Sequence, residues 1–521
     1  MIRFAELLDG LLFTPARNGK LRLMEDYFRS APDPERGWAL AALTGALSFR
    51  EAKPAQVRAL ALERLDPELF AWSYDFVGDL AETVALAWPV RPGANHVPGL
   101  TEIVEGLAQA RRGGVAALIE TWLDALDPTG RWALLKLVTG AMRVGVSARL
   151  AKTAAAALGP VPVDDVEEVW HGLEPPYLPL FAWLTGQGER PETGNKPVFV
   201  PLMLANPLEE GELDALDPSD FLAEWKWDGI RVQLSCRGGR RLYSRTGDEV
   251  TGAFPDVAAV LPDGVILDGE MLAGTPDEVA SFNDLQQRLN RKQVTAQMLR
   301  DHPAFVRLYD ALWIAGEDLR PLPLVVRRQR LESWYRAGPR PLLDLSPLIL
   351  FGSWDELAGL RAGARANGIE GLMLKRARSP YLAGRPKGPW FKWKRGALTL
   401  DCVLMYAQRG HGKRSSFYSD YTFGTWREAE LVPVGKAYSG FTDEELGLLD
   451  RWVRGHTVAK FGPVREVEKA LVLEVAFDSV YRSTRHKSGV AMRFPRIHRI
   501  RWDKPAAEAD HLEALEALIQ P

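Results

Sequence analysis

The sequence predicts a multidomain protein with an all-α N-terminal domain, an α+β central domain and a β-rich C-terminal domain. Its 521 residues are too many for one hydrophobic core, and about 100–200 residues per domain favours three domains over two or four. The hydrophobic period also changes along the chain, from spacings of three and four residues to alternation. The apolar content of 46% is that of an ordinary globular protein, so most of the chain is expected to be packed.

Residues 1–195 are predicted to form the helical domain. Apolar residues recur every three or four positions in "GVAALIETWLDALD" and in "GRWALLKLVTGAMRVGVSARLAKTAAAALG", with Asp-Pro and Gly at the ends. The segment "TGQGERPETGNKPVFVP" covers the end of this domain and the start of the next. Because it is rich in Gly, Pro and charge, it indicates a domain boundary.

Residues 196–396 are predicted to form the α+β domain. Apolar and polar residues alternate in "IRVQLSC", as they do in a half-buried strand, and "RGGR" then forms a hairpin turn before "RLYSRTG". Further strands are expected at "GVILDGEML", "FVRLYDALWIAG" and "EGLMLKRA". Helices such as "SFNDLQQRLNRK" are expected between them.

Residues 397–521 are predicted to form a small β-barrel with an inserted helix. Short strands joined by Gly-rich turns are expected at "LTLDCVLMYAQRG", "YTFGTWRE", "AELVPVGKAYSG" and "LVLEVAFDSVYRS". The inserted helix is "TDEELGLLDRWVRGH", and "EADHLEALEALI" forms a closing helix. An OB-type barrel fits this pattern.

Several classes of protein are excluded by composition. Cys236 and Cys402 are the only cysteines, which excludes a disulfide scaffold and a four-cysteine zinc site and favours a cytoplasmic location. The sequence contains no run of about 18 uncharged apolar residues, so no membrane span is predicted. Acidic residues interrupt the N-terminal segment, which is therefore not expected to be a secretory signal. The net charge of −3 does not indicate a nucleic-acid partner, so only the distribution of charge can do so.

The stretch "EWKWDGIRV" places Lys226 between two tryptophans. Taken alone, this stretch is equally compatible with two interpretations. Lys226 is either a reactive lysine or a solvated residue of a surface hairpin in which Asp228 and Gly229 form the turn. Charged residues near the ends of later strands favour a reactive lysine instead. They are Arg245 in "SRTGDEV", Glu270 in "LDGEM", Glu370 and Lys375 in "EGLMLK", and Lys392 and Lys394 in "PWFKWKRG".

These residues together predict a pocket of cations and acids, although a lone carboxylate on a strand usually belongs to a structural ion pair. Side chains alternate along a strand, so Lys392 and Lys394 are expected on one face and Trp393 on the other. By the same rule, Trp225 and Trp227 should point away from Lys226 and pack against the walls of the site.

In chain order, "KWDGIR", "SRTG", "LDGEM", "RLYDALW", "EGLMLK" and "WFKWK" resemble the motif series of covalent nucleotidyltransferases, most closely that of bacterial-type ATP-dependent DNA ligases. The helical segment "LLKLVTGAMRVGVSARL" is similar to the DNA-binding domain that precedes this core in larger ligases. The segment "RFPRIHRIRWDK" resembles the basic last motif of the OB domain. The resemblance implies an ATP-grasp-like nucleotidyltransferase core, and the sealing of 3′-hydroxyl, 5′-phosphate nicks in duplex DNA.

The resemblance implies that Lys226 attacks the α-phosphorus of ATP and forms a lysyl-AMP intermediate, from which AMP passes to the DNA. An amine nucleophile must be unprotonated, and a free lysine has a pKa of ~10.4. Burial beside the tryptophans, nearby cations and a metal ion are expected to lower the pKa of this lysine. Lys392 and Lys394 are expected to stabilise the phosphate charge of the transition state.

The resemblance also gives roles to other residues. Those expected to bind the nucleotide are Glu224 near the adenine, Arg231 and Arg245 near the sugar and phosphate, Glu270 near the ribose, Tyr309 where the family usually has a stacking phenylalanine, and Lys375 and Arg385. Glu270 and Glu370 are expected to hold Mg²⁺, with Mn²⁺ possible, and Glu370 is the stronger metal candidate. Arg493, Arg496 and Lys504 are alternative candidates for orienting pyrophosphate.

The distribution of charge supports a polynucleotide partner, and the resemblance implies that this partner is nicked duplex DNA. Basic residues outnumber acids between residues 370 and 414, where "QRGHGKRSS" predicts a loop that contacts the phosphate backbone, or else a solvated basic loop. The segment "MRVGVSARL" is either a plain turn between helices or a place where amides at a helix N-terminus bind a DNA phosphate. The resemblance implies a monomer that encircles the DNA.

Other functions are weighed against this one. An RNA ligase or a capping guanylyltransferase shares K-x-D-G and "LDGE", but the helical domain and the sequence around Lys226 argue against both. An NAD-dependent ligase is disfavoured by the missing zinc cysteines. A DNA-binding scaffold that kept an inactive ligase fold would be expected to have lost Lys226, Glu270 or the two lysines of "WFKWK", and all of these are present.

Overall fold

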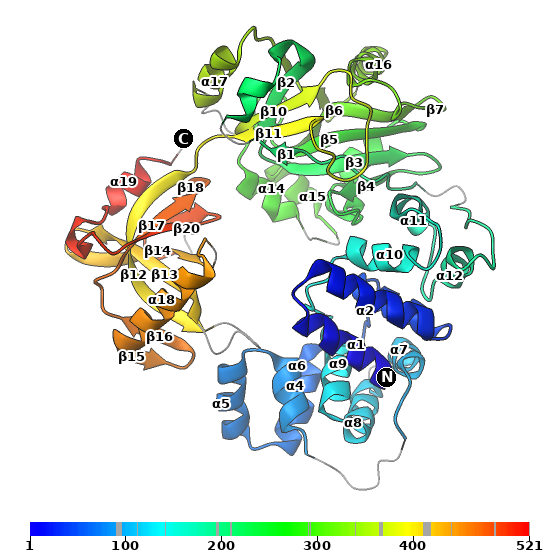
Figure 1. Cartoon of the computed structure of the whole chain (residues 1–521), viewed down its shortest axis with the longest axis vertical. Coiled ribbons are helices and arrows are strands. Elements are labelled where there is room, and N and C mark those ends of the chain that lie inside the picture. The colour runs from blue at the N-terminus through cyan, green and yellow to red at the C-terminus, as the bar shows by residue number, and fades with distance from the viewer. Residues whose placement is uncertain are drawn as a thin grey trace. The chain divides into compact units, whose positions relative to one another are not determined.

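The computed structural model of the chain describes residues 1–89, 96–111, 113–140, 142–193, 197–208, 211–289, 291, 293–338, 340–363, 368–409, 418–438, 440–483 and 486–519 (Figure 1). The chain divides into two compact units. One comprises Lys152–Arg395, and the other comprises Met1–Ala151 together with Gly396–Pro521. Among the described helices, none combines the length and the apolar content that crossing a membrane requires.

The N-terminal part is helical, as predicted. Its helices are α1 (Ile2–Phe13), α2 (Arg17–Ser30), α3 (Glu35–Leu43), α4 (Pro54–Arg64), α5 (Pro67–Val77), α6 (Leu80–Ala87), α7 (Leu100–Gln109), α8 (Val115–Ala125), α9 (Pro128–Thr139), α10 (Ala148–Ala156), α11 (Val163–Trp170) and α12 (Leu178–Leu184). Helix α9 is central: it is buried from Gly130 to Val138 and contacts α1, α6 and α8. Asp127 caps it by accepting a hydrogen bond from the N–H of Gly130.

The central part contains two sheets. Their strands are β1 (Asn206–Pro207), β2 (Phe221–Trp227), β3 (Ile230–Cys236), β4 (Arg241–Ser244), β5 (Val265–Ala273), β6 (Ala304–Ile314), β7 (Glu317–Asp318), β8 (Leu343–Leu345), β9 (Leu348–Ile349), β10 (Ile369–Arg376) and β11 (Trp390–Lys394). One sheet has the order β1-β11-β10-β2-β9. The other has the order β4-β3-β5-β6-β7, with β8 paired to β6.

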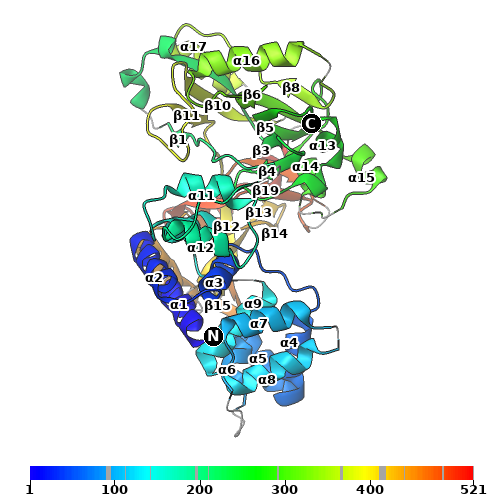
Figure 2. The same ribbon diagram turned by 90° about the vertical axis from the view of Figure 1, so that its right-hand side faces the viewer.

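Helices lie between these strands, as the sequence predicts for an α+β domain. They are α13 (Pro255–Val260), α14 (Phe282–Arg288), α15 (Ala296–Asp301), α16 (Leu324–Arg336) and α17 (Trp354–Gly363). Helix α16 packs against β6 and α14 against β5 (Figure 2). The strands predicted from alternation and short apolar runs are found as β3, β4, β5, β6 and β10, and β3 and β4 form the predicted hairpin.

The turn at Asp228 and Gly229 connects the two sheets, so the alternative of a surface hairpin is wrong. Strand β2 pairs with β9 and β10, whereas β3 pairs with β4 and β5. A Cβ atom on Gly229 would lie 2.3 Å from the carbonyl oxygen of Met271, so only glycine lets the chain pass this close to β5. Lys226 thus lies near the end of β2 in one sheet and Arg231 near the start of β3 in the other, and the charges of both act on Glu270.

Gly229→Ala is therefore expected to destabilise the protein by about 2 kcal/mol or more, because the new methyl group meets backbone that cannot move freely. The free energy of unfolding in urea measures the effect. Gly359→Ala is the matched control. Gly359 lies inside helix α17, and a Cβ atom at this position would meet nothing within 4 Å. That control should be neutral or slightly stabilising, and an equal loss in both variants would contradict the close-approach explanation.

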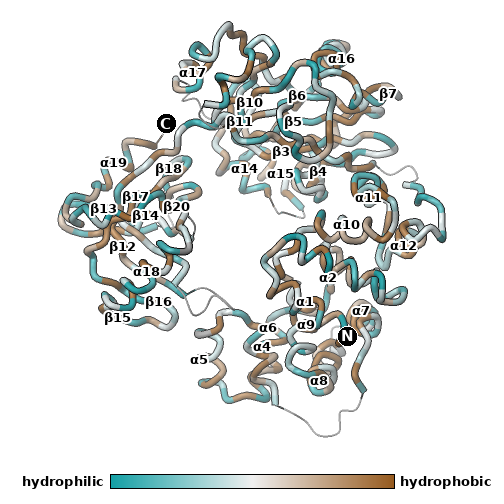
Figure 3. Tube along the Cα trace, in the orientation of Figure 1, coloured by the Kyte–Doolittle hydropathy of each residue, from teal (hydrophilic) through white to brown (hydrophobic). Residues whose placement is uncertain are grey.

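The C-terminal part is a β-rich region with one long inserted helix, as predicted. Its elements are β12 (Leu398–Arg409), β13 (Tyr418–Arg427), β14 (Glu430–Ala437), α18 (Asp443–Gly455), β15 (Thr457–Phe461), β16 (Val464–Val467), β17 (Val472–Phe477), β18 (Ser479–Arg482), β19 (Val490–Arg493), β20 (Arg496–Arg501) and α19 (Leu512–Glu516). The sheet order is β14-β13-β12-β16-β15, and β17 joins β12 to β20. Strand pairing among the described residues does not close this sheet into a barrel. Brown apolar stretches run along β12 and β17 in Figure 3.

Candidate active site

Lys226 lies near the end of β2, between two tryptophans that face away from it. Trp227 is buried in an apolar cluster with Leu272, Phe305 and Ile369, and its Nε1 donates a hydrogen bond to the Oγ of Ser346 at 3.1 Å. Trp225 packs against the same cluster. Both rings therefore pack in the apolar interior, as expected for side chains that alternate with Lys226 along the strand.

Glu370 reaches Lys226 because the register of β10 shifts at this point. Ile369 pairs with Trp227 and Gly371 pairs with Lys226, so Glu370 lies in a bulge between two paired positions. Its Oε2 forms an ion pair with the Nζ of Lys226. The Nζ of Lys394, from β11, lies 3.4 Å from the same oxygen. The bulge thus aims one carboxylate at two ammonium groups.

The two carboxylates of this site have opposite pKa shifts. Burial opposes the ionisation of Glu370, but the charge and hydrogen bond of Lys226, with Lys394, lower its pKa to about 2. Burial raises the pKa of Glu270 to about 8, helped by the negative charges of Glu370 and Asp268, although Lys226 and Arg231 act in the other direction. Without a bound ligand, the site favours one charged and one protonated carboxyl group near neutral pH.

We expect Glu370→Gln to destabilise the protein by about 2 kcal/mol at pH 5 and at pH 9, because the contribution of the ion pair is lost only as the pH falls below 4.5 toward 2. Glu270→Gln should behave differently. The contribution of protonated Glu270 is fully present below pH 4.5 and is lost as the pH rises through about 8, so the substitution should stabilise the protein at pH 9 more than at pH 5.

Chemical denaturation in buffer without nucleotide or metal measures both changes. Each variant is the control for the other, because both convert a carboxylate to an amide in the same site. Equal pH dependence of the two variants would contradict the opposite pKa shifts.

Four of the predicted cations come together around a fifth, Lys392. Burial lowers the pKa of Lys392, and so do the positive charges of Arg385, Lys394, Arg245 and Lys226. Lys392 is half-buried on β11, whereas Arg245 and Arg385 are exposed on loops. Side chains from four separate segments of the chain thus concentrate positive charge beside Lys226, which suits a site for phosphate groups.

Glu224 and Lys375 form a buried pair on neighbouring strands. The Nζ of Lys375 lies 3.1 Å from Oε1 of Glu224, and the two side chains are only 2% and 3% exposed. The same ammonium lies 4.2 Å from the ring centroid of Tyr309 and 4.8 Å from that of Trp390. The structure thus brings three predicted nucleotide-binding residues together and adds Trp390.

Sequence reasoning missed Asp268 and Tyr381. Asp268 is fully buried on β5 and binds the guanidinium of Arg231 through both carboxylate oxygens, at 3.0 and 2.5 Å. Tyr381 donates a hydrogen bond to the Oδ2 of Asp268 at 2.8 Å. A signal for Asp268 was present in "LDGEM". Asp268 lies two residues before Glu270, and residues two apart share one face of a strand. No local pattern indicates Tyr381.

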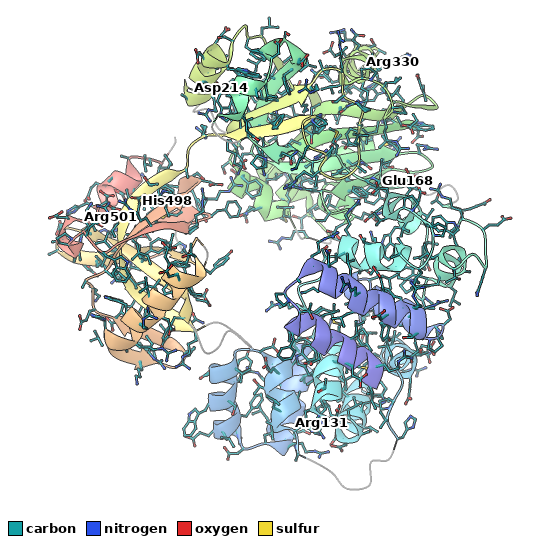
Figure 4. The ribbon with its side chains drawn as sticks, in the orientation of Figure 1. Arg131, Glu168, Asp214, Arg330, His498 and Arg501 are labelled. Carbon is teal, nitrogen blue, oxygen red and sulfur yellow. The ribbon has the colours of Figure 1, made fainter. Side chains whose placement is uncertain are left out.

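The three candidates of the last motif differ in their contacts. The Nζ of Lys504 donates to Oδ2 of Asp401 at 2.7 Å, and Nη1 of Arg496 lies 3.1 Å from Oδ1 of Asp478. Arg493 lies at the end of β19, with its guanidinium carbon 5.1 Å from the ring centroid of Phe494. Arg501, labelled in Figure 4, also contacts Asp401 at 3.2 Å. The choice among the three candidates stays open.

The two predicted DNA-contacting segments differ in how far the structure describes them. In "QRGHGKRSS", residues 410–416 lie outside the described residues. In "MRVGVSARL", the Nζ of Lys20 donates to the carbonyl oxygens of Val144 and Gly145 at 2.7 and 2.9 Å, and helix α10 begins at Ala148. Contact of either segment with DNA stays a prediction.

The comparisons with known proteins agree with one another. Residues 202–394 match the family described as ATP dependent DNA ligase domain, and residues 414–504 match the ATP dependent DNA ligase C terminal region. A protein of Koribacter versatilis (strain Ellin345), named "Probable DNA ligase", is 34% identical over 99% of this chain and 96% of its own length. "DNA ligase 1" of Korarchaeum cryptofilum (strain OPF8) is 28% identical over 99% of this chain and 97% of its own length.

Among solved structures, "Pmar-Lig_PreS3" matches with a TM-score of 0.61 and 16% identity, covering 96% of this chain and 99% of that one, which shows a shared fold. The two-sheet core with its lysine, carboxylates and cations is thus a nucleotidyltransferase-like core, which follows a helical region and precedes a β-rich region in the sequence. The chain belongs to the ATP-dependent DNA ligases. None of these matches favours an RNA ligase or a capping enzyme.

Proposed function

We propose that this ligase seals nicks between a 3′-hydroxyl and a 5′-phosphate in duplex DNA, with Lys226 as the group that carries AMP. The observation that supports this proposal best is the position of Lys226, on a strand end between carboxylates and a concentration of cations. A nucleophilic amine for phosphoryl chemistry needs such cations, because negative charge builds up on the phosphate oxygens.

In the first step, the Nζ of Lys226 would form a bond to the α-phosphorus of ATP and give up a proton. The bond from that phosphorus to the oxygen bridging to the β-phosphate breaks, and pyrophosphate leaves. In the second step, an oxygen of the DNA 5′-phosphate attacks the same phosphorus, and the nitrogen–phosphorus bond breaks. In the third, the 3′-hydroxyl attacks the 5′-phosphorus and AMP leaves. Lys392 and Lys394 would neutralise the phosphate charge in the first step.

The proposal places the nucleotide along the residues that meet at this site. Tyr309, Glu224 and Lys375 would receive the base, because an aromatic ring and a buried charged pair lie together there. Arg231 and Glu270 would lie beside the ribose, and Arg245 and Arg385 beside the phosphates. The OB type of the C-terminal region, a monomer that encircles the nick and a cytoplasmic location are parts of the same proposal. The strand pattern supports the first, the family resemblance the second, and the low number of cysteines the third.

Glu270 and Glu370 are the carboxylates that would hold Mg²⁺, or Mn²⁺ in its place. In the described residues, no group of three or more His, Cys, Asp or Glu side chains could enclose a metal ion. Two neighbouring carboxylates still fit Mg²⁺, which often binds one or two carboxylates together with substrate phosphates and water. Their negative charges already influence each other, as the raised pKa of Glu270 indicates. The bound ion would help to neutralise phosphate charge.

Incubation with Mg²⁺ and α-labelled ATP tests the proposal. We expect label on the protein from ATP and not from GTP, followed by sealing of nicked DNA in preference to nicked RNA. The absence of an adduct from ATP would contradict the lysyl-AMP mechanism. An adduct from GTP, or equal sealing of RNA, would instead favour the capping-type or RNA-ligase alternatives.

A further inference from the structure

The carboxylate of Asp268 is the centre of a saturated hydrogen-bond network in the core of the central unit. Oδ1 accepts from the Nε of Arg231 at 3.0 Å and from the hydroxyl of Tyr309 at 3.2 Å. Oδ2 accepts from the Nη2 of Arg231 at 2.5 Å and from the hydroxyl of Tyr381 at 2.8 Å. An ionised carboxylate has about four acceptor sites. All of them are filled here, which a fully buried carboxylate requires.

The same network fixes Arg231. Its Nη2 also donates to the hydroxyl of Tyr381 at 3.1 Å, and its Nη1 donates to the carbonyl oxygen of Met203 at 2.7 Å. A guanidinium has five N–H donors, and four of them are used in these bonds. Arg231 therefore keeps a single N–H of Nη1 for a ligand, and its orientation is set before any ligand binds.

Tyr309 is fixed from two directions. Its hydroxyl is tied to Asp268, and the ammonium of Lys375 covers one face of its ring at 4.2 Å, itself paired with Glu224. A base that stacks on Tyr309 must therefore use the other face of the ring. The phenylalanine that the family resemblance leads one to expect here has no hydroxyl, so it would leave one acceptor site of Asp268 empty.

We propose that Asp268 is a positioning residue that holds the Tyr309 ring and the Arg231 guanidinium as one preorganised platform for the nucleoside of ATP, with the Tyr309 hydroxyl as the link. This inference rests on the proposed function, because it assumes that ATP binds at this site. Because these side chains are already ordered, less conformational entropy is lost when the ligand binds. The hydrogen bond from the Tyr309 hydroxyl to Asp268 is the tether that holds this platform together. Its loss should affect the affinity for ATP and leave the bond-forming step at Lys226 unchanged.

Tyr309→Phe tests the tether, because it removes the hydroxyl and keeps the ring. We expect the KM for ATP in steady-state nick sealing to rise about threefold to tenfold, which corresponds to the free-energy cost of ordering one side chain, with kcat unchanged within about twofold. Tyr243→Phe is the matched control: it removes a buried hydroxyl of the same unit, which donates to the carbonyl oxygen of Pro197 at 2.6 Å and does not contact Asp268. This control should leave KM and kcat unchanged.

A second measurement separates this inference from the proposed function. ATP binding is measured by calorimetry in chains that carry Lys226→Ala, with and without Tyr309→Phe, so that affinity is read without reaction. A threefold to tenfold weaker affinity supports the tether, and Tyr381→Phe, on the other carboxylate oxygen, should also weaken binding. Unchanged affinity in both tyrosine variants, or a fall in kcat at constant KM, would overturn the inference. Failure of the unsubstituted chain to form an adduct would overturn the proposed mechanism instead.

Discussion

Lys226→Ala is expected to lower self-adenylation by at least about three orders of magnitude, because no other amine among the described residues has the same position. The nearest competitor is Lys394, whose Nζ lies 3.4 Å from the same Glu370 oxygen that pairs with Lys226. Lys394 comes from β11, on the opposite side of β10 from β2, and its side chain is 47% exposed. Label from α-labelled ATP, followed by identification of the labelled residue, measures the loss and its site.

The same variant should still seal a nick whose 5′-phosphate already carries AMP, since only the final attack by the 3′-hydroxyl remains. This result would show that the loss is chemical and that the variant is folded. Lys394→Ala is the control, because it removes the neighbouring ammonium and keeps the nucleophile, so an adduct should still form. Label found on Lys394, or an adduct that persists in Lys226→Ala, would refute the assignment of the nucleophile.

Much of the fold could be predicted because its signals are local. Alternation in "IRVQLSC" and short apolar runs bounded by turns located β3, β4, β5, β6 and β10, and helical spacing located the N-terminal region. Pairing between distant strands has no local signal. Residues 224–232 were equally compatible with a hairpin, yet β2 pairs with β10, whose Gly371 lies opposite Lys226. The close approach of Gly229 to Met271 likewise depends on a strand about forty residues further along the chain.

Much of the site could also be predicted, because charged residues at strand ends are conspicuous in an apolar pattern. The partners of these residues could not be predicted. Glu370 pairs with Lys226 because a bulge re-aims it. Asp268 binds Arg231, and its position two residues before Glu270 does not reveal this partner. Tyr381 comes from an irregular segment, where no period relates a residue to its neighbours in space. Packing brings such residues together, and only the structure displays it.

Lys392→Met is expected to slow self-adenylation by about a hundredfold, the range observed when one fixed donor to transition-state charge is removed. Lys392 is the half-buried centre of the cation cluster, whereas Lys394 is more exposed and contacts Glu370, so Lys394→Met should have a smaller effect. Lys387→Met is the matched control on an exposed lysine of the same segment, and should leave the rate unchanged. Single-turnover rates with saturating ATP measure all three variants.

The pH dependence distinguishes a charge effect from a loss of packing. Burial and the neighbouring cations lower the pKa of Lys392, so its positive charge is lost at a lower pH than that of an ordinary lysine. If that charge stabilises the transition state, the adenylation rate should fall as the pH rises through the alkaline range. Lys392→Arg should retain part of the rate and shift this fall to higher pH, because a guanidinium stays protonated. An unchanged alkaline profile in Lys392→Arg would mean that the length of Lys392, and not its charge, sets the rate.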